Sequence, residues 1–435
     1  MKTAPRTSSV AGDLGSSPAS MPWQSGARIP THAIGASRPG GSIGVFGTFY
    51  PESGMAGTFA TGLVLALAES GLLTSVVAFC QSGAVIPAGE RWSNVQLRPC
   101  WKHDDPVSLL KAMLVLKSHS KALNGYLFNT YVTAFGRTSA ANVVGLLMPP
   151  LLALLTGKPV VVYMHNFLET QDAVQLGYQP SRLQRWGVHL LEQILLRATR
   201  VVVPLESQRN SVSKAFRLTP RWILVPFTEP FGLIASMAGP PVQRPIPPDT
   251  PARILLLGKW GPQKDLTGVL RTLRSVRDRG GQFTLSITGA INTRFPESQN
   301  EVNRVVATMD SRWFRFLGNV PENDLLNVVQ NSDLVILPYN ATGGYSGAMS
   351  VSAYCGLGII AYDLPQLRET ARGLGVEPVF VTKGDEGALA EEVLLFCAGV
   401  RAFRRERRSI PRSDCDARVR DGARRLLELL LSSDD

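Results

Sequence analysis

Residues 334–356, LVILPYNATGGYSGAMSVSAYCG, decide the fold of the second half of this chain. A short apolar run ends at Pro338, a loop of small residues follows, and the sequence then takes on a helical pattern. A glycine loop between a buried strand and a helix start leaves backbone N–H groups free, and the helix dipole adds positive potential at the same place. The stretch therefore predicts an anion-binding loop.

A second candidate anion site lies upstream, at residues 254–265, ILLLGKWGPQKD. An apolar strand again runs into a glycine loop, and this loop carries two cations, Lys259 and Lys264. Phosphate groups are favoured partners for lysine side chains and for helix starts. Two such strand ends in one half of the chain predict a ligand that carries a diphosphate.

The composition is that of an ordinary globular protein, because 44% of the 435 residues are hydrophobic and 18% are charged. A chain of this length is too long for one typical core, so two domains are expected. The net charge of +11 and a pI of about 9.6 favour anionic partners such as phosphates, an acidic membrane surface or nucleic acid. For most of the arginines, however, a solvated helix face is the simpler explanation.

Both halves alternate strand-like and helix-like segments, which predicts an α/β fold with parallel sheets covered on both faces. In the first half, strands are expected at 42–49, 72–79, 125–128, 160–163 and 201–203; in the second half, at 254–257, 284–288, 315–317, 334–337 and 358–361. The predicted organisation is a disordered tail (1–39), a first Rossmann-like domain (40–230), a proline-rich linker (231–251), a second Rossmann-like domain (252–400) and an arginine-rich C-terminal helix (401–435).

Several other classes of protein receive no support from the sequence. Five cysteines without CxxC or Cys/His spacing predict neither zinc nor a disulfide framework, and they fit a reducing cytoplasm. The apolar stretch 140–164 is interrupted by prolines, so we expect a short helix that starts at Pro149 and Pro150, followed by a buried strand. No nucleic-acid-binding motif accompanies the positive charge.

The second half resembles the C-terminal domain of GT-B glycosyltransferases of the retaining family-four type. The resemblance covers about residues 253–370 and rests on three segments in order: ILLLGKWGPQKD, FLGNVPENDLLNVVQNSDLVILPY and YSGAMSVSAYCGLGIIAYDLPQLRE. In the first half, YPESGMAGTFATGLVLALAESG resembles the family's glycine loop and first helix, and PVVVYMHN resembles its strand that ends in an active-site histidine.

The resemblance implies GT-B architecture, with two Rossmann-like domains facing each other across a cleft. It implies transfer of a sugar from a nucleotide-diphosphate sugar to a glycan, lipid-linked or other acceptor, with retention and without a metal or other cofactor. Lys259 and Lys264 would neutralise the leaving diphosphate, which the N–H groups around Tyr345, Ser346, Gly347 and Ala348 would also bind. His165 would contact the sugar or act in catalysis. The loop of Ser53, Gly54, Met55, Ala56 and Gly57 would lie near the acceptor or the diphosphate.

This chain departs from the family pattern at a pair of carboxylates. Many members carry Glu-x7-Glu across the donor loop and helix, and those positions are Gly343 and Val351 here. Lys259 also stands where the family usually has arginine, which keeps the charge but loses the two-pronged hydrogen bond. A non-catalytic GT-B-like subunit that supports a partner transferase is therefore the alternative hypothesis.

The run DPVSLLKAMLVLKSHSK at residues 105–121 is apolar with interleaved lysines. It fits a basic amphipathic helix docked on an anionic membrane. It also fits an ordinary domain helix with its lysines in water, and this second interpretation is favoured because it is the more common case. The expected location is the cytoplasm, with attachment at the inner face of the membrane as the option that this helix leaves open.

Overall fold

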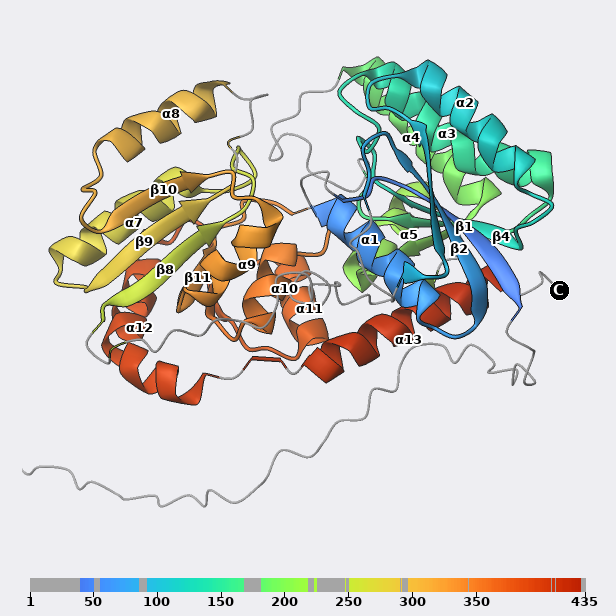
Figure 1. Ribbon diagram of the computed structural model, residues 1–435. Coiled ribbons are helices and arrows are strands. Elements are labelled where there is room, and N and C mark those ends of the chain that lie inside the picture. The colour runs from blue at the N-terminus through green and yellow to red at the C-terminus, as the bar shows by residue number, and fades with distance from the viewer. Residues whose placement is uncertain are drawn as a thin grey trace, which may run out of the picture. The chain divides into compact units, whose positions relative to one another are not determined.

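The computed structural model describes residues 40–50, 55–85, 92–167, 181–217, 223–224, 247, 250–289, 291, 296–342, 344–407, 409–410 and 412–431. Within these residues the chain forms two sheets, each made only of parallel strands (Figure 1). This confirms the predicted α/β fold. The predicted tail, nearly all of the predicted linker, and two predicted site residues, Ser53 and Gly54, lie outside the described residues.

The first sheet has seven strands in the order β3-β2-β1-β4-β5-β6-β7. Its strands are β1 (Gly41–Phe46), β2 (Leu73–Gln81), β3 (Val95–Trp101), β4 (Gly125–Thr130), β5 (Val160–Met164), β6 (Arg200–Val203) and β7 (Ile223–Leu224). The helices between them are α1 (Met55–Ala68), α2 (Pro106–Ser118), α3 (Ser139–Thr156), α4 (Arg182–Ala198) and α5 (Glu206–Phe216). The central strands β4 and β5 are buried throughout, which is why β5 is a continuous apolar run and not an alternating one, whereas β4 ends in two buried polar residues, Asn129 and Thr130.

The second sheet has six strands in the order β10-β9-β8-β11-β12-β13. Its strands are β8 (Ala252–Leu257), β9 (Phe283–Thr288), β10 (Phe314–Gly318), β11 (Leu334–Leu337), β12 (Gly358–Tyr362) and β13 (Val379–Val381). The helices are α7 (Leu266–Asp278), α8 (Pro296–Ala307), α9 (Glu322–Gln330), α10 (Gly347–Tyr354), α11 (Pro365–Leu374) and α12 (Glu386–Glu406), followed by α13 (Arg412–Leu431). Strands β8 and β11 are neighbours, so the two predicted anion loops follow adjacent strands of one sheet.

Two helices differ from the sequence prediction. α3 does not start at Pro149 and Pro150 but runs through them from Ser139 to Thr156, begun by the Thr138 side chain and ended by Gly157 in the left-handed conformation. α1 begins at Met55, so Met55, Ala56 and Gly57 belong to a helix and not to the predicted loop. Two edge strands, β3 and β13, were not predicted, because β3 is largely exposed and β13 has only three residues, so neither gives a clear apolar run.

The arginine-rich C-terminal segment is divided between two helices, the end of α12 and the whole of α13. Helix α13 packs beside α1, and its apolar side chains complete the core on one face of the first sheet. The residues that do so are Ala423, Leu426, Leu427, Leu429 and Leu430, all buried. The chain thus leaves the first sheet to build the second and returns to the first sheet at its end.

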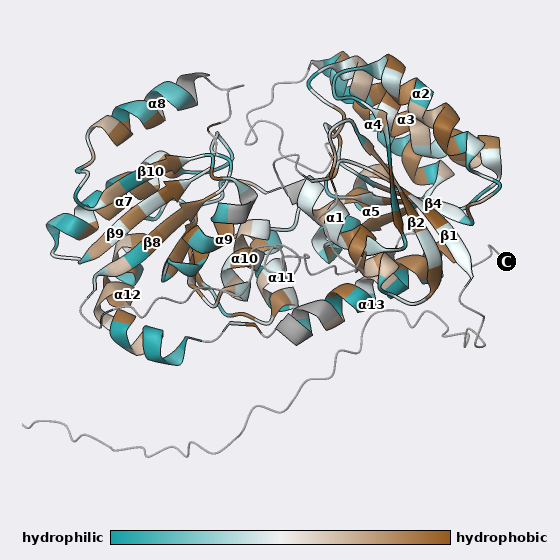
Figure 2. Ribbon diagram, viewed as in Figure 1, coloured by the Kyte–Doolittle hydropathy of each residue, from teal (hydrophilic) through white to brown (hydrophobic). Residues whose placement is uncertain are grey.

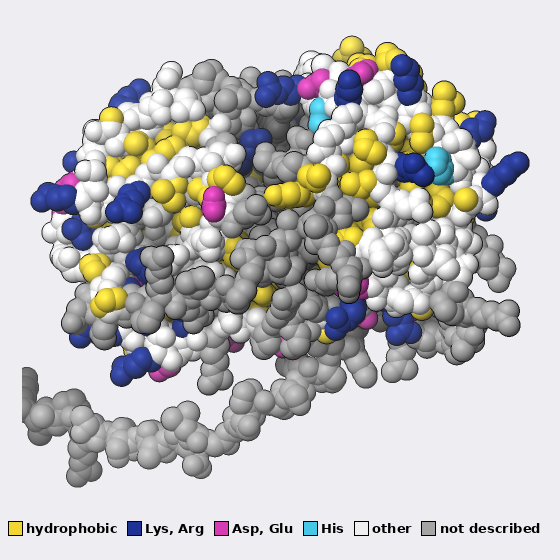
Figure 3. Space-filling view, viewed as in Figure 1, with side chains coloured by type: hydrophobic (Ala, Val, Ile, Leu, Met, Phe, Trp, Pro, Cys, Tyr) yellow, Lys and Arg dark blue, Asp and Glu magenta, His cyan; other side chains and the backbone are white. Residues whose placement is uncertain are grey.

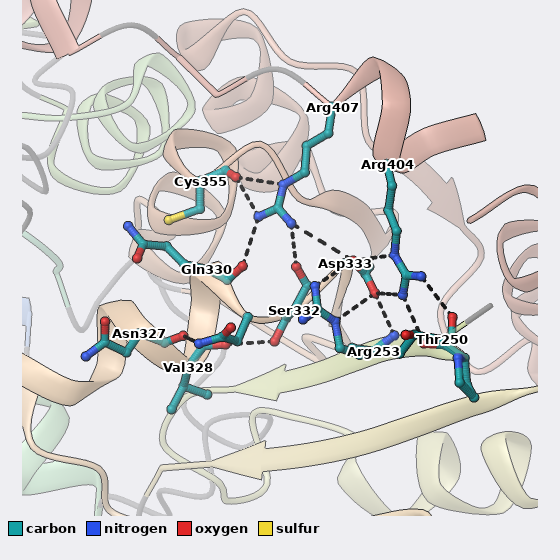
Figure 4. Close-up of polar contacts among 12 residues, drawn as sticks. Thr250, Arg253, Asn327, Val328, Gln330, Ser332, Asp333, Cys355, Arg404 and Arg407 are labelled. Atoms are coloured by element: carbon teal, nitrogen blue, oxygen red, sulfur yellow. Dashed lines mark hydrogen bonds and ion pairs between the residues drawn. The ribbon is translucent and has the colours of Figure 1, made fainter. Parts of the chain in front are cut away.

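A fully buried carboxylate, Asp333, stands at the start of β11 among three arginines (Figure 4). Arg253 on β8 donates to it from Nε and Nη2 at 3.1 and 3.0 Å, and Arg404 at the end of α12 donates at 3.1 and 2.7 Å. Arg407 lies 4.0 Å away and donates mainly to the carbonyls of Ser332 and Cys355. Burial raises the pKa of Asp333, but the hydrogen bonds from Arg404 and Arg253 outweigh it and hold that pKa below its ordinary value.

Candidate functional site

The two predicted anion loops are joined by backbone hydrogen bonds at the carboxyl ends of β8 and β11. The N–H of Asp265 donates to the carbonyl of Pro338 at 2.9 Å, and the N–H of Asn340 donates to the carbonyl of Gln263 at 2.8 Å. Ligands of open parallel sheets bind at this end of the strands, where helix starts collect. The two segments that the sequence singled out therefore form one surface at the expected edge of the sheet.

Lys264 is at the centre of this surface and is only 7% exposed. Its Nζ donates to the carbonyl of Leu257 at 2.9 Å and lies 5.0 Å from the ring centre of Trp260 and 4.4 Å from that of Tyr339. Gly258 has a φ of +138°, and a Cβ there would lie 1.9 Å from the Lys264 Nζ, so only glycine fits beside the ammonium group. Among the described residues no carboxylate forms an ion pair with Lys264.

Ser346 begins α10 and connects it to the lysine. Its Oγ accepts the N–H of Met349 at 3.3 Å and donates to the Tyr339 hydroxyl at 3.2 Å, while the Tyr339 ring lies against Lys264. The first N–H groups of a helix, here those of Gly347 and Ala348, have no acceptor within the helix. Lysine, tyrosine, serine and helix start thus form a continuous polar group of the kind that binds an anion.

His165 follows β5 in the first sheet. Its Nε2 lies 2.8 Å from the Oδ1 of Asn129, and its ring meets the edge of Phe59 with centres 4.7 Å apart. The carbonyl of His165 accepts the Nε2 of Gln208 at 3.1 Å and lies so close to Gly344 that a Cβ on this glycine would be 2.6 Å from it. The histidine and the glycine loop, which the sequence treated as separate site segments, are therefore in close contact.

Burial lowers the pKa of His165 to about 4, so its imidazole is uncharged at neutral pH. A neutral ring bonded through Nε2 to an amide oxygen can hold a fixed tautomer and present polar atoms to a sugar, but it adds no positive charge to the site. Charge for an anionic ligand comes from Lys264 and the start of α10.

The titration of His165 gives a testable pH dependence. The unfolded histidine has a pKa near 6.5 and the folded one about 4, so the stabilisation is complete above pH 6.5 and is lost as pH falls toward 4. The loss amounts to at most about 3 kcal/mol, since one pKa unit corresponds to about 1.36 kcal/mol. Denaturant unfolding at a series of pH values should show this decline in the wild type and not in His165→Gln. Parallel curves for the two proteins would contradict it, because all other groups cancel in the comparison.

The remaining predicted residues are placed differently. Lys259 is exposed on the loop, and its carbonyl accepts a hydrogen bond from the Gln263 side chain at 3.0 Å. Tyr345 lies half-buried directly before the helix start. Of the two missing family carboxylates, Gly343 lies outside the described residues and Val351 is buried in the apolar core beneath α10.

Trp260, Tyr339 and Asn129 were not predicted as site residues. The two aromatic residues stand within the motif segments, on either side of the lysine in space, but nothing in the sequence indicates that their rings would enclose its ammonium group. Asn129 is a buried polar residue at the end of an apolar strand, and that position was a usable signal. In the described part of the chain no group of three His, Cys, Asp or Glu residues is arranged to bind a metal ion.

Comparisons with known proteins concern the family and the fold of the chain. Residues 251–398 match the family described as Glycosyl transferases group 1. No curated protein matches the chain in sequence. The match to the family model covers the part of the chain that contains both anion loops.

Solved structures resemble nearly the whole chain. WaaG, a glycosyltransferase involved in lipopolysaccharide biosynthesis, matches with a TM-score of 0.59 and 11% identity over 90% of this chain and 100% of its own. Sucrose-phosphate synthase from Thermosynechococcus elongatus matches with a TM-score of 0.59 and 14% identity over 90% and 96%. HepE from Anabaena, solved in complex with UDP-glucose, matches with a TM-score of 0.54 and 12% identity over 89% and 94%. The two-sheet fold of the chain is the GT-B fold of these proteins.

Proposed function

We propose that this chain, whose residues 251–398 match the family described as Glycosyl transferases group 1, transfers a sugar from a nucleotide-diphosphate sugar to an acceptor hydroxyl. The observation that carries the proposal is the Lys264 ammonium group, which is buried, has no carboxylate partner among the described residues and is connected through Tyr339 to Ser346 at the start of α10. A buried cation is costly unless an anion accompanies it. The diphosphate of the donor is that anion.

In this proposal the chemistry is electrostatic. Negative charge grows on the diphosphate as the sugar leaves, and donors already fixed in place stabilise it without further reorganisation. A lysine ammonium has three N–H donors, and one of those of Lys264 is used by the Leu257 carbonyl, so two remain for phosphate oxygens. Lys259, exposed on the same loop, adds a second cation to the outer side of the diphosphate.

We propose further that the reaction needs no metal, because lysines and helix N–H groups take over the neutralising role that a metal has elsewhere. We also propose that the sugar's stereochemistry is retained, with the leaving phosphate assisting removal of the acceptor proton, a route that requires no carboxylate nucleophile. His165, uncharged and bonded to Asn129, is assigned to contact the donor sugar.

The donor and acceptor are proposed by class. HepE was solved with UDP-glucose and WaaG acts in lipopolysaccharide biosynthesis, so a UDP-hexose is the first donor to test, and a glycan or a lipid-linked saccharide in the cytoplasm is the first acceptor. The alternative, a non-catalytic subunit that supports a partner transferase, is favoured by one observation: the position of the second family carboxylate is occupied by the buried side chain of Val351.

The donor site is tested by thermal unfolding of the full chain with UDP, GDP, ADP and dTDP in the absence of metal. A nucleotide at a hundred times its dissociation constant stabilises the fold by about 2.7 kcal/mol, which corresponds to a rise in melting temperature of about 5 °C. We expect a selective rise with one base, and we expect Lys264→Met to abolish it. Lys214→Met, which removes an exposed lysine on α5, is the matched control and should keep the rise.

Two results separate the hypotheses. A selective rise in melting temperature together with donor hydrolysis or transfer supports the transferase. A selective rise with no turnover of any sugar donor supports the non-catalytic subunit. Equal stabilisation of the wild type and Lys264→Met would contradict the assignment of the diphosphate to this loop.

A further inference from the structure

Helices α2, α3 and α4 carry most of the large apolar side chains that the described residues expose. They lie side by side, and eleven of the eighteen such side chains are on them. We call this surface the apolar helix face; its members are Val107, Leu110 and Leu114 on α2, Val143, Leu151, Leu154 and Leu155 on α3, and Leu183, Trp186, Leu190 and Ile194 on α4. An exposed apolar patch of this extent marks an interaction surface.

The members recur at helical spacing, so each helix presents one apolar stripe. On α4 the residues Leu183, Trp186, Leu190 and Ile194 follow one another at intervals of three or four, and Leu183 and Trp186 are 76% and 64% exposed. On α3 the most exposed is Leu154, at 81%. Figure 2 colours the apolar residues of α2 and α3 brown, and in Figure 3 apolar and basic side chains are interspersed over the same part of the molecule.

The charges on the three helices are of one sign. Five basic residues are exposed on them, and their only acidic residue, Glu192, is buried. The basic residues are Lys111 and Lys117 on α2 and Arg182, Arg185 and Arg197 on α4. Two acidic residues, Asp104 and Asp105, precede α2 and accept the backbone N–H groups of Thr138 and Ser108 respectively, and they are outnumbered by the five exposed basic residues. The partner that complements this face therefore has negatively charged groups at its surface and an apolar interior that the exposed side chains can enter.

Helix α3 passes, by length and composition, as a helix that could cross a membrane, the one such helix in the described part of the chain. Its inner side, however, is built into the first sheet: Gly145, Leu146 and Leu152 are buried, and a Cβ on Gly145 would lie 2.1 Å from the Phe135 ring. Crossing a bilayer would require α3 to leave this core. Its exposed side fits contact with a bilayer from the outside.

We propose that the apolar helix face docks into the headgroup region of an anionic phospholipid bilayer. The leucines and Trp186 insert at the boundary of the acyl chains, where tryptophan is favoured, and the lysines and arginines contact the lipid phosphates. A second copy of the chain is a poorer partner, because face-to-face packing would bring the same basic residues opposite each other. The proposal does not depend on transferase activity.

The test is co-sedimentation of the full chain with vesicles of phosphatidylcholine, with and without phosphatidylglycerol. We expect binding only to the vesicles that contain phosphatidylglycerol, and weaker binding as salt is raised. Leu154→Gln combined with Trp186→Gln should reduce binding at least tenfold. Arg182→Gln combined with Arg185→Gln should reduce it about twenty-five-fold, since each cation near such a surface contributes about fivefold.

Matched variants on the second sheet's helices control for loss of surface apolarity and charge in general. Leu395→Gln on α12 removes a leucine that is 69% exposed, and Arg274→Gln on α7 removes an exposed arginine. Both should bind vesicles as the wild type does. Equal binding by all variants would overturn the proposal, as would a dimer in sedimentation analysis that Leu154→Gln with Trp186→Gln dissociates, because the face would then cover a protein partner.

Discussion

Asp333→Ala is expected to lower the free energy of unfolding by about 3–5 kcal/mol, the loss found when one partner of a buried ion pair is removed. Asp333 is fully buried, and Arg253 and Arg404 each donate two side-chain hydrogen bonds to it. Without the carboxylate the two guanidinium groups stay in the fold with no counter-charge, and Arg407 loses a nearby anion. The cost is therefore that of uncompensated buried charge and not of one hydrogen bond.

Denaturant unfolding at neutral pH measures this loss directly. The control is Glu391→Ala. Glu391 lies on α12, the helix that carries Arg404, and forms an exposed ion pair with Arg279. Its removal should change the free energy of unfolding by less than about 1 kcal/mol. A loss of similar size in both variants would mean that burial does not set the strength of the Asp333 cluster. Because the folded pKa of Asp333 is below its unfolded value, its contribution should be lost only in acid, below about pH 4.

Lys264→Met should lower turnover of the nucleotide-sugar donor by about a hundredfold to a thousandfold, as does removal of one fixed donor from an oxyanion site. Methionine keeps an unbranched apolar stem between Trp260 and Tyr339 while removing the charge, so the loop is expected to stay folded. The measurement is initial rate of donor turnover with the nucleotide selected by thermal unfolding, and Lys214→Met is again the control.

The outcome depends on which kinetic constant changes. Loss of a group that acts mainly on the departing diphosphate lowers kcat, whereas loss of a group that binds donor and transition state equally raises KM alone. A change confined to KM would make Lys264 a binding residue only. Unchanged turnover in a folded Lys264→Met protein would remove it from the site altogether.

Two central strands of the second sheet could be predicted from the sequence, because each is a continuous apolar run followed by a glycine loop. Residues 254–257 and 334–337 were predicted as strands and are β8 and β11, in neighbouring positions. The carboxyl ends of parallel strands lie at one edge of the sheet. Two loops that follow such strands are therefore expected to lie near each other, which predicts that Lys264 and Ser346 belong to one site.

Other features depended on contacts that a single sequence does not contain. Pro149 and Pro150 predict a helix start, yet α3 runs through them, because its buried residues are held against the first sheet and outweigh the missing N–H donors. The sequence does not indicate whether the Lys264 side chain is solvated or enclosed by the rings of Trp260 and Tyr339. The sequence also did not indicate that α13 returns to the first sheet and packs on it, because the leucines of this helix could pack on any apolar surface.

That return has a consequence for how the chain is made. The core around Ile43 and Val45 is completed by Leu426, Leu427 and Leu430, which are almost the last described residues to be synthesised. At about 5–20 residues per second, the roughly 200 residues between β7 and Leu426 delay the completion of this core by about 10–40 s. Through that interval the nascent chain keeps an open apolar surface where α13 will lie, so the core of the first sheet is completed only after the second sheet has been synthesised.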